Sequence, residues 1–146
     1  MQEGKTQRVD IYIETDCLLQ SKTIRKYGYV LSGTYKGEPY TKESFGSMDG
    51  TYHQTILHAA AEAMGRIKIK ADVTVHTKDA HVASRLPKWK KLKESGFLDA
   101  KGAEIRNAAE WREICKVAEN LTIQTEYGKH EYSSWLLEEM RKQVIA

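Results

Sequence analysis

Between residues 9 and 46 the chain alternates apolar and polar side chains with the period of two that is typical of β-strands. The first run has Val9, Ile11 and Ile13 at alternate positions and ends on an acidic residue, Asp16. Gly37 and Pro39 mark a turn farther along. We therefore expect an antiparallel meander of three strands at residues 9–16, 27–35 and 40–45, followed by a loop at 46–50.

From residue 51 the spacing of apolar residues changes to the three or four of an amphipathic helix. Thr51 followed by Gln54 is a capping-box pattern, which predicts a helix start, and Asn107 followed by Glu110 predicts a second one. The apolar stripe of the first helix consists of Leu57, Ala60, Ala61, Met64 and Ile67.

The remaining segments alternate between short strands and helices. Gly96 ends a basic helix at residues 88–94, in the position of a C-cap. The last helix carries apolar residues that include Trp135, which we expect in the core, or at an interface if the protein dimerises. The other expected elements are strands at 73–77 and 121–125, a short helix at 79–85, a loop at 97–106, and a last helix with Leu136, Met140 and Val144.

The order β-β-β-α-β-α-α-α-β-α predicts one α/β domain that spans residues 1–146. A strand that follows a helix usually returns parallel to the strand before it. We therefore expect a five-stranded mixed sheet, with a three-stranded antiparallel meander plus two parallel strands, flanked by helices.

Composition narrows the class of protein. The 146 residues are 40% hydrophobic and 29% charged, as in water-soluble folded domains, and the net charge of +3 is mild. Cys17 and Cys115 form no metal-ligand pattern and fit reduced thiols, so we expect a cytoplasmic protein. We expect no membrane segment, because no apolar run approaches the roughly 18 residues that a span needs.

Six short motifs follow one another along the chain: Thr15-Asp16, Tyr27-Gly28-Tyr29-Val30-Leu31, the helix start Thr51–Ala60, His76-Thr77-Lys78-Asp79, the basic run Lys88-Trp89-Lys90-Lys91, and Tyr127-Gly128-Lys129-His130. In their order and spacing they resemble the motifs of type I ribonuclease H. The third of these has an uncharged residue where the family has Glu, and the fourth has Lys where the family has Asp. His130 or Lys129 stands for the family's loop histidine.

The resemblance implies a site in which four carboxylates hold two magnesium or manganese ions for phosphodiester hydrolysis. Asp16 corresponds to the first acid, and at most this one residue is expected to be a metal ligand. The second acid falls on Ile56 and the third on Lys78, although Asp79 is adjacent. Glu138 corresponds to the fourth acid. We therefore expect a ribonuclease H-like domain whose catalytic site is incomplete, that is, a pseudoenzyme.

The basic segment corresponds to the protrusion with which some family members hold an RNA–DNA hybrid. Its residues Lys88, Lys90, Lys91 and Lys93 favour contacts with phosphates, and Trp89 is available for stacking. The alternative is a solvated helix face with Trp89 as a packing residue.

Three hypotheses about function follow. The first is an impaired domain that binds nucleic acid, as an RNA–DNA hybrid or a duplex, or a protein partner. The second is a divergent metal-dependent hybrid ribonuclease that uses Asp16, Asp79 and Glu138 around one magnesium or manganese ion. The third is an interaction module without a nucleic-acid function.

Overall fold

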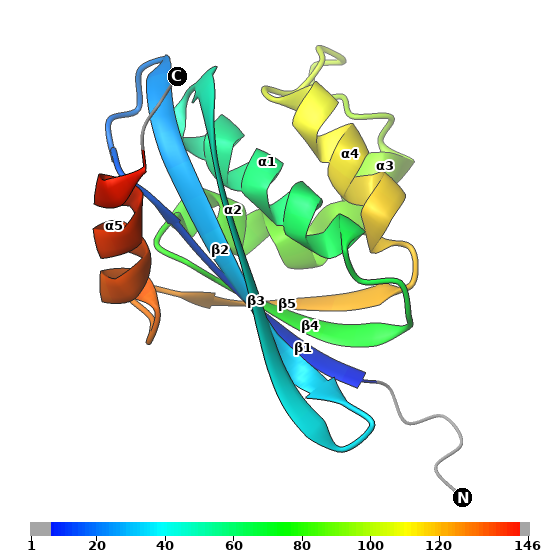
Figure 1. Ribbon diagram of the computed structural model, residues 1–146. Helices are drawn as coiled ribbons and strands as arrows, with labels where there is room; N and C mark the ends of the chain where they lie inside the picture. Colours follow the sequence, from blue (N-terminus) through cyan, green and yellow to red (C-terminus); the bar gives the residue numbers. More distant parts are fainter. Residues whose placement is uncertain (1–6, 144–146) are drawn as a thin grey trace, which may run out of the picture.

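The computed structural model describes residues 7–143, which form a mixed β-sheet with helices on both faces (Figure 1). The order of the strands across the sheet is β3-β2-β1-β4-β5. The strands are β1 (Gln7–Thr15), β2 (Thr23–Tyr35), β3 (Glu38–Gly50), β4 (Ala71–Thr77) and β5 (Leu121–Tyr127). The helices are α1 (Tyr52–Gly65), α2 (Ala80–Arg85), the 3-10 turn η1 (Leu86–Lys88), α3 (Trp89–Glu94), α4 (Ala108–Ala118) and α5 (Ser133–Lys142).

The pairing of the strands confirms the expected mixed sheet. β1 and β2 are antiparallel, with Ile11 opposite Leu31, and β2 and β3 continue the meander. β4 is parallel to β1, with Val9 beside Val73, and β5 is parallel to β4. The first helix therefore carries the chain from the meander back to the sheet in the direction of β1.

The helices divide between two layers, and each layer has its own core. α1 to α4 lie on one face of the sheet and α5 lies on the other (Figure 1). Ile11 and Ile13 point into the larger core beneath α1, whereas Tyr12 points to the smaller core beneath α5. This alternation follows from the period of two along β1. No helix within residues 7–143 is long and apolar enough to cross a membrane.

The start of α1 is capped as the sequence predicts. The hydroxyl of Thr51 accepts a hydrogen bond from the Gln54 amide at 3.2 Å, and Gln54 Oε1 accepts one from the Thr51 amide at 3.3 Å. These two bonds satisfy backbone groups that a helix start leaves free. Ala59 and Ala60 are fully buried, because their small side chains let the helix lie close to the sheet.

The expected loop at residues 46–50 and the second capping box are wrong. β3 continues to Gly50 because it stays paired with β2 as far as Thr23. Asn107 has a φ of 61° and makes no side-chain cap. The Glu110 carboxylate accepts a hydrogen bond from Gln54 Nε2 instead, and this bond joins α4 to α1.

Trp135 lies outside the core, contrary to expectation. It is 42% exposed, and its ring lies 6.1 Å from that of Phe45 on the sheet. Leu136 and Met140 on the same helix are fully buried, so the apolar stripe is narrower than the sequence suggested. Val144, expected in the same stripe, lies outside the described residues.

Candidate functional site

A buried carboxylate, Glu14, lies near the end of β1. It is 2% exposed, and its Oε1 atom lies 3.3 Å from the Nζ atom of Lys78. The parallel register places Tyr12 beside His76. Two residues farther along each segment, Glu14 lies beside Lys78. An ion pair therefore occupies the junction between β1 and β4.

The other oxygen of Glu14 is held from α5 and the loop before it. The Ser133 hydroxyl donates a hydrogen bond to Oε2, and the Nε2 atom of His130 lies 3.4 Å from the same oxygen. His130 Nε2 donates to the carbonyl of Ile13 at 3.0 Å, while its Nδ1 accepts from the Tyr132 amide at 3.2 Å. This pattern assigns a neutral ring, and burial lowers the pKa of His130 below its usual value.

The cluster of Glu14, Lys78, His130 and Ser133 resembles no ordinary site for a divalent cation. Such sites require several converging oxygen ligands, whereas the only carboxylate of the cluster has nitrogen atoms of Lys78 and His130 as neighbours. Ile56, the position of an expected acid, is 1% exposed and packs in the apolar core. Within residues 7–143 no three His, Cys, Asp or Glu side chains are arranged to hold a metal ion.

The structure does not bring Asp16, Asp79 and Glu138 together. Asp16 is exposed just after β1, and its carboxylate accepts a hydrogen bond from the Lys26 amide at 2.9 Å, as a turn residue does. Glu138 is exposed on α5 and pairs with Arg141 at 2.7 Å, which lowers the pKa of the Glu138 carboxyl.

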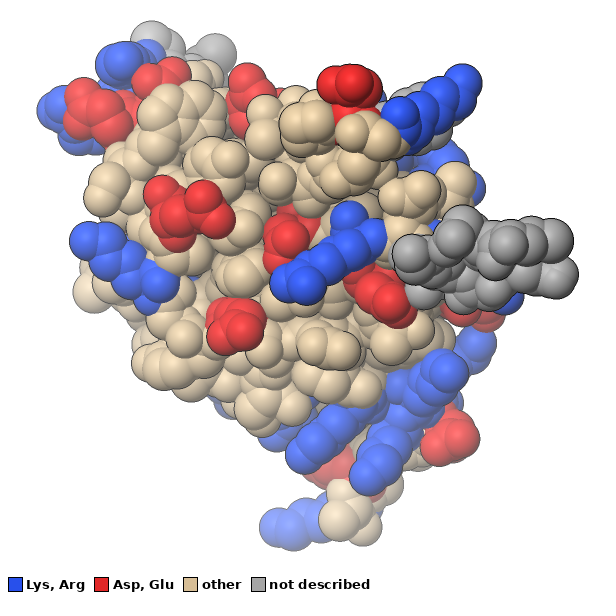
Figure 2. Space-filling view, turned by 90° about the horizontal axis from the view of Figure 1, so that it is seen from below, with Lys and Arg blue, Asp and Glu red and all other residues tan. Residues whose placement is uncertain are grey.

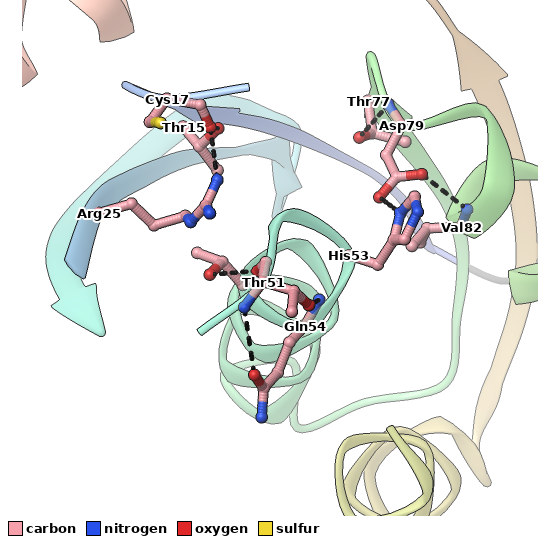
Figure 3. A network of polar contacts seen from close by, with 10 residues as sticks. Thr15, Cys17, Arg25, Thr51, His53, Gln54, Thr77, Asp79 and Val82 are labelled. Atoms are coloured by element: carbon pink, nitrogen blue, oxygen red, sulfur yellow. Dashed lines mark hydrogen bonds and ion pairs between the residues drawn. The ribbon is translucent and has the colours of Figure 1, made fainter. Parts of the chain in front are cut away.

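Asp79 is buried at the start of α2, and its carboxylate interacts with two neighbouring groups (Figure 3). Its Oδ1 accepts a hydrogen bond from the Val82 amide at 3.1 Å, which caps the helix. Its Oδ2 lies 2.6 Å from His53 Nδ1, in the first turn of α1. Asp79 therefore orients an imidazole, and both of its oxygens have partners within the protein.

Arg25 is a buried cation with a structural role (Figure 3). Its guanidinium donates to the carbonyls of Cys17 and Ser21 at 2.7 Å and to that of Gly50 at 3.1 Å. These bonds tie the connection between β1 and β2 to the residues before α1. Because three carbonyls occupy it, Arg25 is not available to an anionic ligand.

Beside His53 lies a pocket of about 720 Å³ whose lining includes two histidines and two arginines. The ring of His81 lies 4.7 Å from that of His53, measured between centroids. Partial burial of the ring, together with the charge of Arg85 and the nearby His53, lowers the pKa of His81. The lining of the pocket is His53, His81, Arg85, Asp99, Glu104, Ile105, Arg106, Asn107 and Trp111.

A second, smaller groove of about 280 Å³ runs between α2 and α3 and shares Arg85 with the pocket. Lys88 and Lys91 also line it, together with the uncharged Ser84 and Leu92. No hydrogen bond or ion pair within residues 7–143 engages the charged groups of these three cations. The two hollows therefore form one cationic surface, defined by Arg85, Lys88, Lys91 and Arg106.

Trp89 does not belong to this surface, and its burial favours the alternative in which it is a packing residue. It is 5% exposed and packs in the core between α3 and α4, where its carbonyl lies 3.9 Å from Cys115 Sγ. Lys90 lies over its ring at 5.7 Å, and Lys93 pairs with Glu119 at 3.2 Å.

No protein-family profile and no curated protein sequence matches this chain. Solved structures show the fold. LC9-RNase H1, a type 1 RNase H with the type 2 active-site motif, is 18% identical with a TM-score of 0.67, over 94% of this chain and 70% of that one. The RNase H domain of PFV is 19% identical with a TM-score of 0.69, over 93% of both chains.

Two related structures contain nucleic acid. The foamy viral protease-reverse transcriptase in complex with dsDNA is 11% identical with a TM-score of 0.65, over 95% of this chain and 94% of that one. The same viral protein in complex with an RNA/DNA hybrid is 11% identical with a TM-score of 0.61, over 92% of this chain and 19% of that one. At these identities the comparisons establish the ribonuclease H-like fold.

Several residues of the site are not evident from the sequence. The alternation along β1 shows only that Glu14 faces α5, on the side opposite its neighbours Ile13 and Thr15. Its pairing with Lys78 depends on the register of β1 against β4, which no local pattern specifies. The proximity of Arg85 and Arg106 depends on how the loop before α4 returns to α2.

Proposed function

We propose that this ribonuclease H-like chain binds duplex nucleic acid, an RNA–DNA hybrid in particular, and lacks the metal-dependent hydrolysis of ribonuclease H. The observation that carries the proposal is the groove between α2 and α3, which presents three cations that have no partner in the described part of the chain, Arg85, Lys88 and Lys91. Phosphates of a nucleic-acid backbone are the ligands that such a groove fits best.

The arrangement around Glu14 supports the loss of metal-dependent hydrolysis. Two divalent ions held by carboxylates need several negative charges at one point. Here Lys78 neutralises the buried carboxylate, and Ile56 supplies an apolar side chain where the resemblance implies an acid. The remaining candidates, Asp79 and Glu138, are bound to His53 and Arg141 respectively.

The distribution of charge favours binding through a local surface. Seen from below, most of the molecule is uncharged, and acidic and basic side chains are interspersed (Figure 2). Lys and Arg lie at several places in this view and are densest at its lower right. With a net charge of +3, the chain has no general excess of positive charge, so binding has to use a local surface.

The test is the affinity for a fluorescent RNA–DNA hybrid, measured by anisotropy at several salt concentrations. We expect the logarithm of the binding constant to fall linearly with the logarithm of salt concentration. Lys88→Glu combined with Lys91→Glu should weaken binding at least 10-fold and reduce the salt slope by about two, one for each lost phosphate contact.

The matched control is Lys42→Glu combined with Lys70→Glu, which makes the same charge change at exposed residues outside the groove. The control should retain a salt slope near that of the unaltered chain. Equal losses in both variants would indicate a nonspecific effect of net charge. If the unaltered chain failed to bind hybrid or duplex at 50 mM salt, the proposal would be wrong and a protein partner would be favoured.

A further inference from the structure

We propose that His53, oriented by Asp79, and His81 form a metal-independent acid–base pair that cleaves unpaired RNA by transesterification. This inference rests on the proposed nucleic-acid binding and adds a reaction to it. It concerns the pocket beside the start of α1, which is separate from the cluster of Glu14, Lys78, His130 and Ser133.

The first observation is the fixed orientation of His53. Its Nδ1 lies 2.6 Å from the Oδ2 atom of Asp79, a residue that is 1% exposed. A carboxylate only accepts hydrogen bonds, so Nδ1 carries a proton in either charge state of the ring. The opposite ring atom, Nε2, is therefore the one that gains or loses a proton. An Asp–His contact holds the catalytic imidazole in the same way in the Ser-His-Asp triad.

The second observation is the different environment of the neighbouring imidazole. The His81 ring lies 4.7 Å from that of His53, but the cation beside it is Arg85, and among residues 7–143 no carboxylate is hydrogen bonded to it. Its neutral form is favoured, since burial and Arg85 lower its pKa. His53 in its charged form makes an ion pair with Asp79. Two titratable groups with such unlike surroundings suit the roles of base and acid.

The third observation is the charge that lines the rest of the pocket. The guanidinium groups of Arg85 and Arg106 have no partner among residues 7–143. The two acidic side chains of the lining are already engaged, Asp99 by the amides of residues 101 and 103 and Glu104 by Arg112. The unpaired arginines therefore favour a phosphate and stabilise the additional negative charge of a phosphorane-like transition state.

The reaction needs no metal ion and no co-reactant. His81 Nε2 or Nδ1 takes the proton of a ribose 2′-hydroxyl, whose oxygen attacks the adjacent phosphorus. The bond between phosphorus and the 5′-oxygen breaks, and protonated His53 gives its Nε2 proton to that oxygen. The products are a 2′,3′-cyclic phosphate and a 5′-hydroxyl, with His81 protonated and His53 neutral until solvent restores them. Unpaired RNA is the substrate because the attacking and leaving oxygens have to align.

The test uses the whole chain and a labelled single-stranded RNA oligonucleotide in excess EDTA. We expect slow cleavage whose products carry 2′,3′-cyclic phosphate and 5′-hydroxyl ends by mass spectrometry. The same oligonucleotide with 2′-deoxyribose throughout should stay intact. His53→Gln and His81→Gln should each lower the rate about 100-fold or more.

Two controls make the result specific. His58→Gln changes a half-exposed histidine on the same helix, outside the pocket, and should cleave like the unaltered chain. Gln at position 53 can still donate a hydrogen bond to Asp79, so thermal unfolding should show that this variant folds. Equal cleavage by His53→Gln and by the unaltered protein would identify a contaminating nuclease and overturn the inference.

Binding of the same oligonucleotide separates this inference from the proposed function. Salt-dependent binding without EDTA-resistant cleavage would overturn only the acid–base pair. Products with 3′-hydroxyl and 5′-phosphate ends would also overturn it, because those ends arise from attack by water. Absence of binding to RNA, hybrid and duplex alike would overturn the proposed function as well.

Discussion

Lys78 and Glu14 form an ion pair at 3.3 Å where the parallel strands β1 and β4 meet. Glu14 is 2% exposed, whereas Lys78 retains partial access to solvent. The ammonium group balances the buried carboxylate within the protein itself. This relationship explains how the fold keeps an acidic residue buried at this point.

Removing the ammonium group should destabilise the protein. Lys78→Met leaves Glu14 buried and unpaired, and we expect a loss of about 3 kcal/mol in the free energy of unfolding, at the lower end for buried pairs because Lys78 is partly exposed. Urea unfolding monitored by circular dichroism measures the loss. Adding Glu14→Gln to Lys78→Met should recover part of it, and no recovery would argue against the ion pair as the cause.

Acidic residues in place of Lys78 and Ser133 should create a cation site. Both side chains contact Glu14, so Lys78→Asp with Ser133→Asp gathers three carboxylates at one point. We expect this variant to be less stable without metal because like charges repel, and to gain about 2.7 kcal/mol when manganese exceeds its dissociation constant 100-fold. Thermal unfolding with and without manganese checks this, and the unaltered chain is the control. If manganese left the thermal stability of the variant unchanged, this would contradict the conclusion that residues 78 and 133 both lie beside Glu14.

Buried His130 should make stability depend on pH. The pKa of His130 in the folded state lies below its ordinary value of 6.5, so below that pH the unfolded chain binds more protons. The contribution is fully present above pH 6.5 and is lost as pH falls, with a slope of at most about 1.4 kcal/mol per pH unit.

The control for this slope is His130→Gln, which can still donate a hydrogen bond to the Ile13 carbonyl. Urea unfolding between pH 7.5 and 5 should show a smaller loss of stability in the variant than in the unaltered chain. Parallel curves for the two proteins would show that His130 does not titrate differently in the folded and unfolded states.

The two tryptophans Trp89 and Trp135 should respond differently to truncation. Trp89→Ala removes a 5% exposed ring from the core and should cost about 3–5 kcal/mol of stability. Trp135→Ala changes a side chain that is 42% exposed and should cost about 0.5 kcal/mol. Chemical denaturation measures both. Similar losses would contradict the burial of Trp89, and with it the conclusion that its ring is unavailable to a ligand.

The sequence predicted most of the architecture because local patterns determine it. The alternation in β1 and the capping box of Thr51 and Gln54 were each sufficient to place an element. The second capping box failed because Asn107 adopts a left-handed conformation and its partner Glu110 bonds across to α1. The local pattern could not show that Gln54 of α1 would bind the Glu110 carboxylate in place of the cap.

The site was harder to predict, since it depends on which distant residues meet. The motif Thr15-Asp16 directed attention to Asp16, which the structure places in a turn, while Glu14 two residues earlier is the carboxylate beside Lys78. If the strand continued through residue 16, Glu14 and Asp16 would face the same side, so the period of two could not choose between them. Only the register of β1 against β4 decides.

By itself the sequence determined the order of the elements, the mixed sheet and the unusual residues Ile56 and Lys78 at positions where the resemblance implies acids. These follow from periodicity, capping and spacing along the chain. The tertiary structure alone decided the ion pair of Glu14 and the cationic surface of Arg85, Lys88, Lys91 and Arg106. Their partners are far apart in sequence, and strand register and helix packing set their distances.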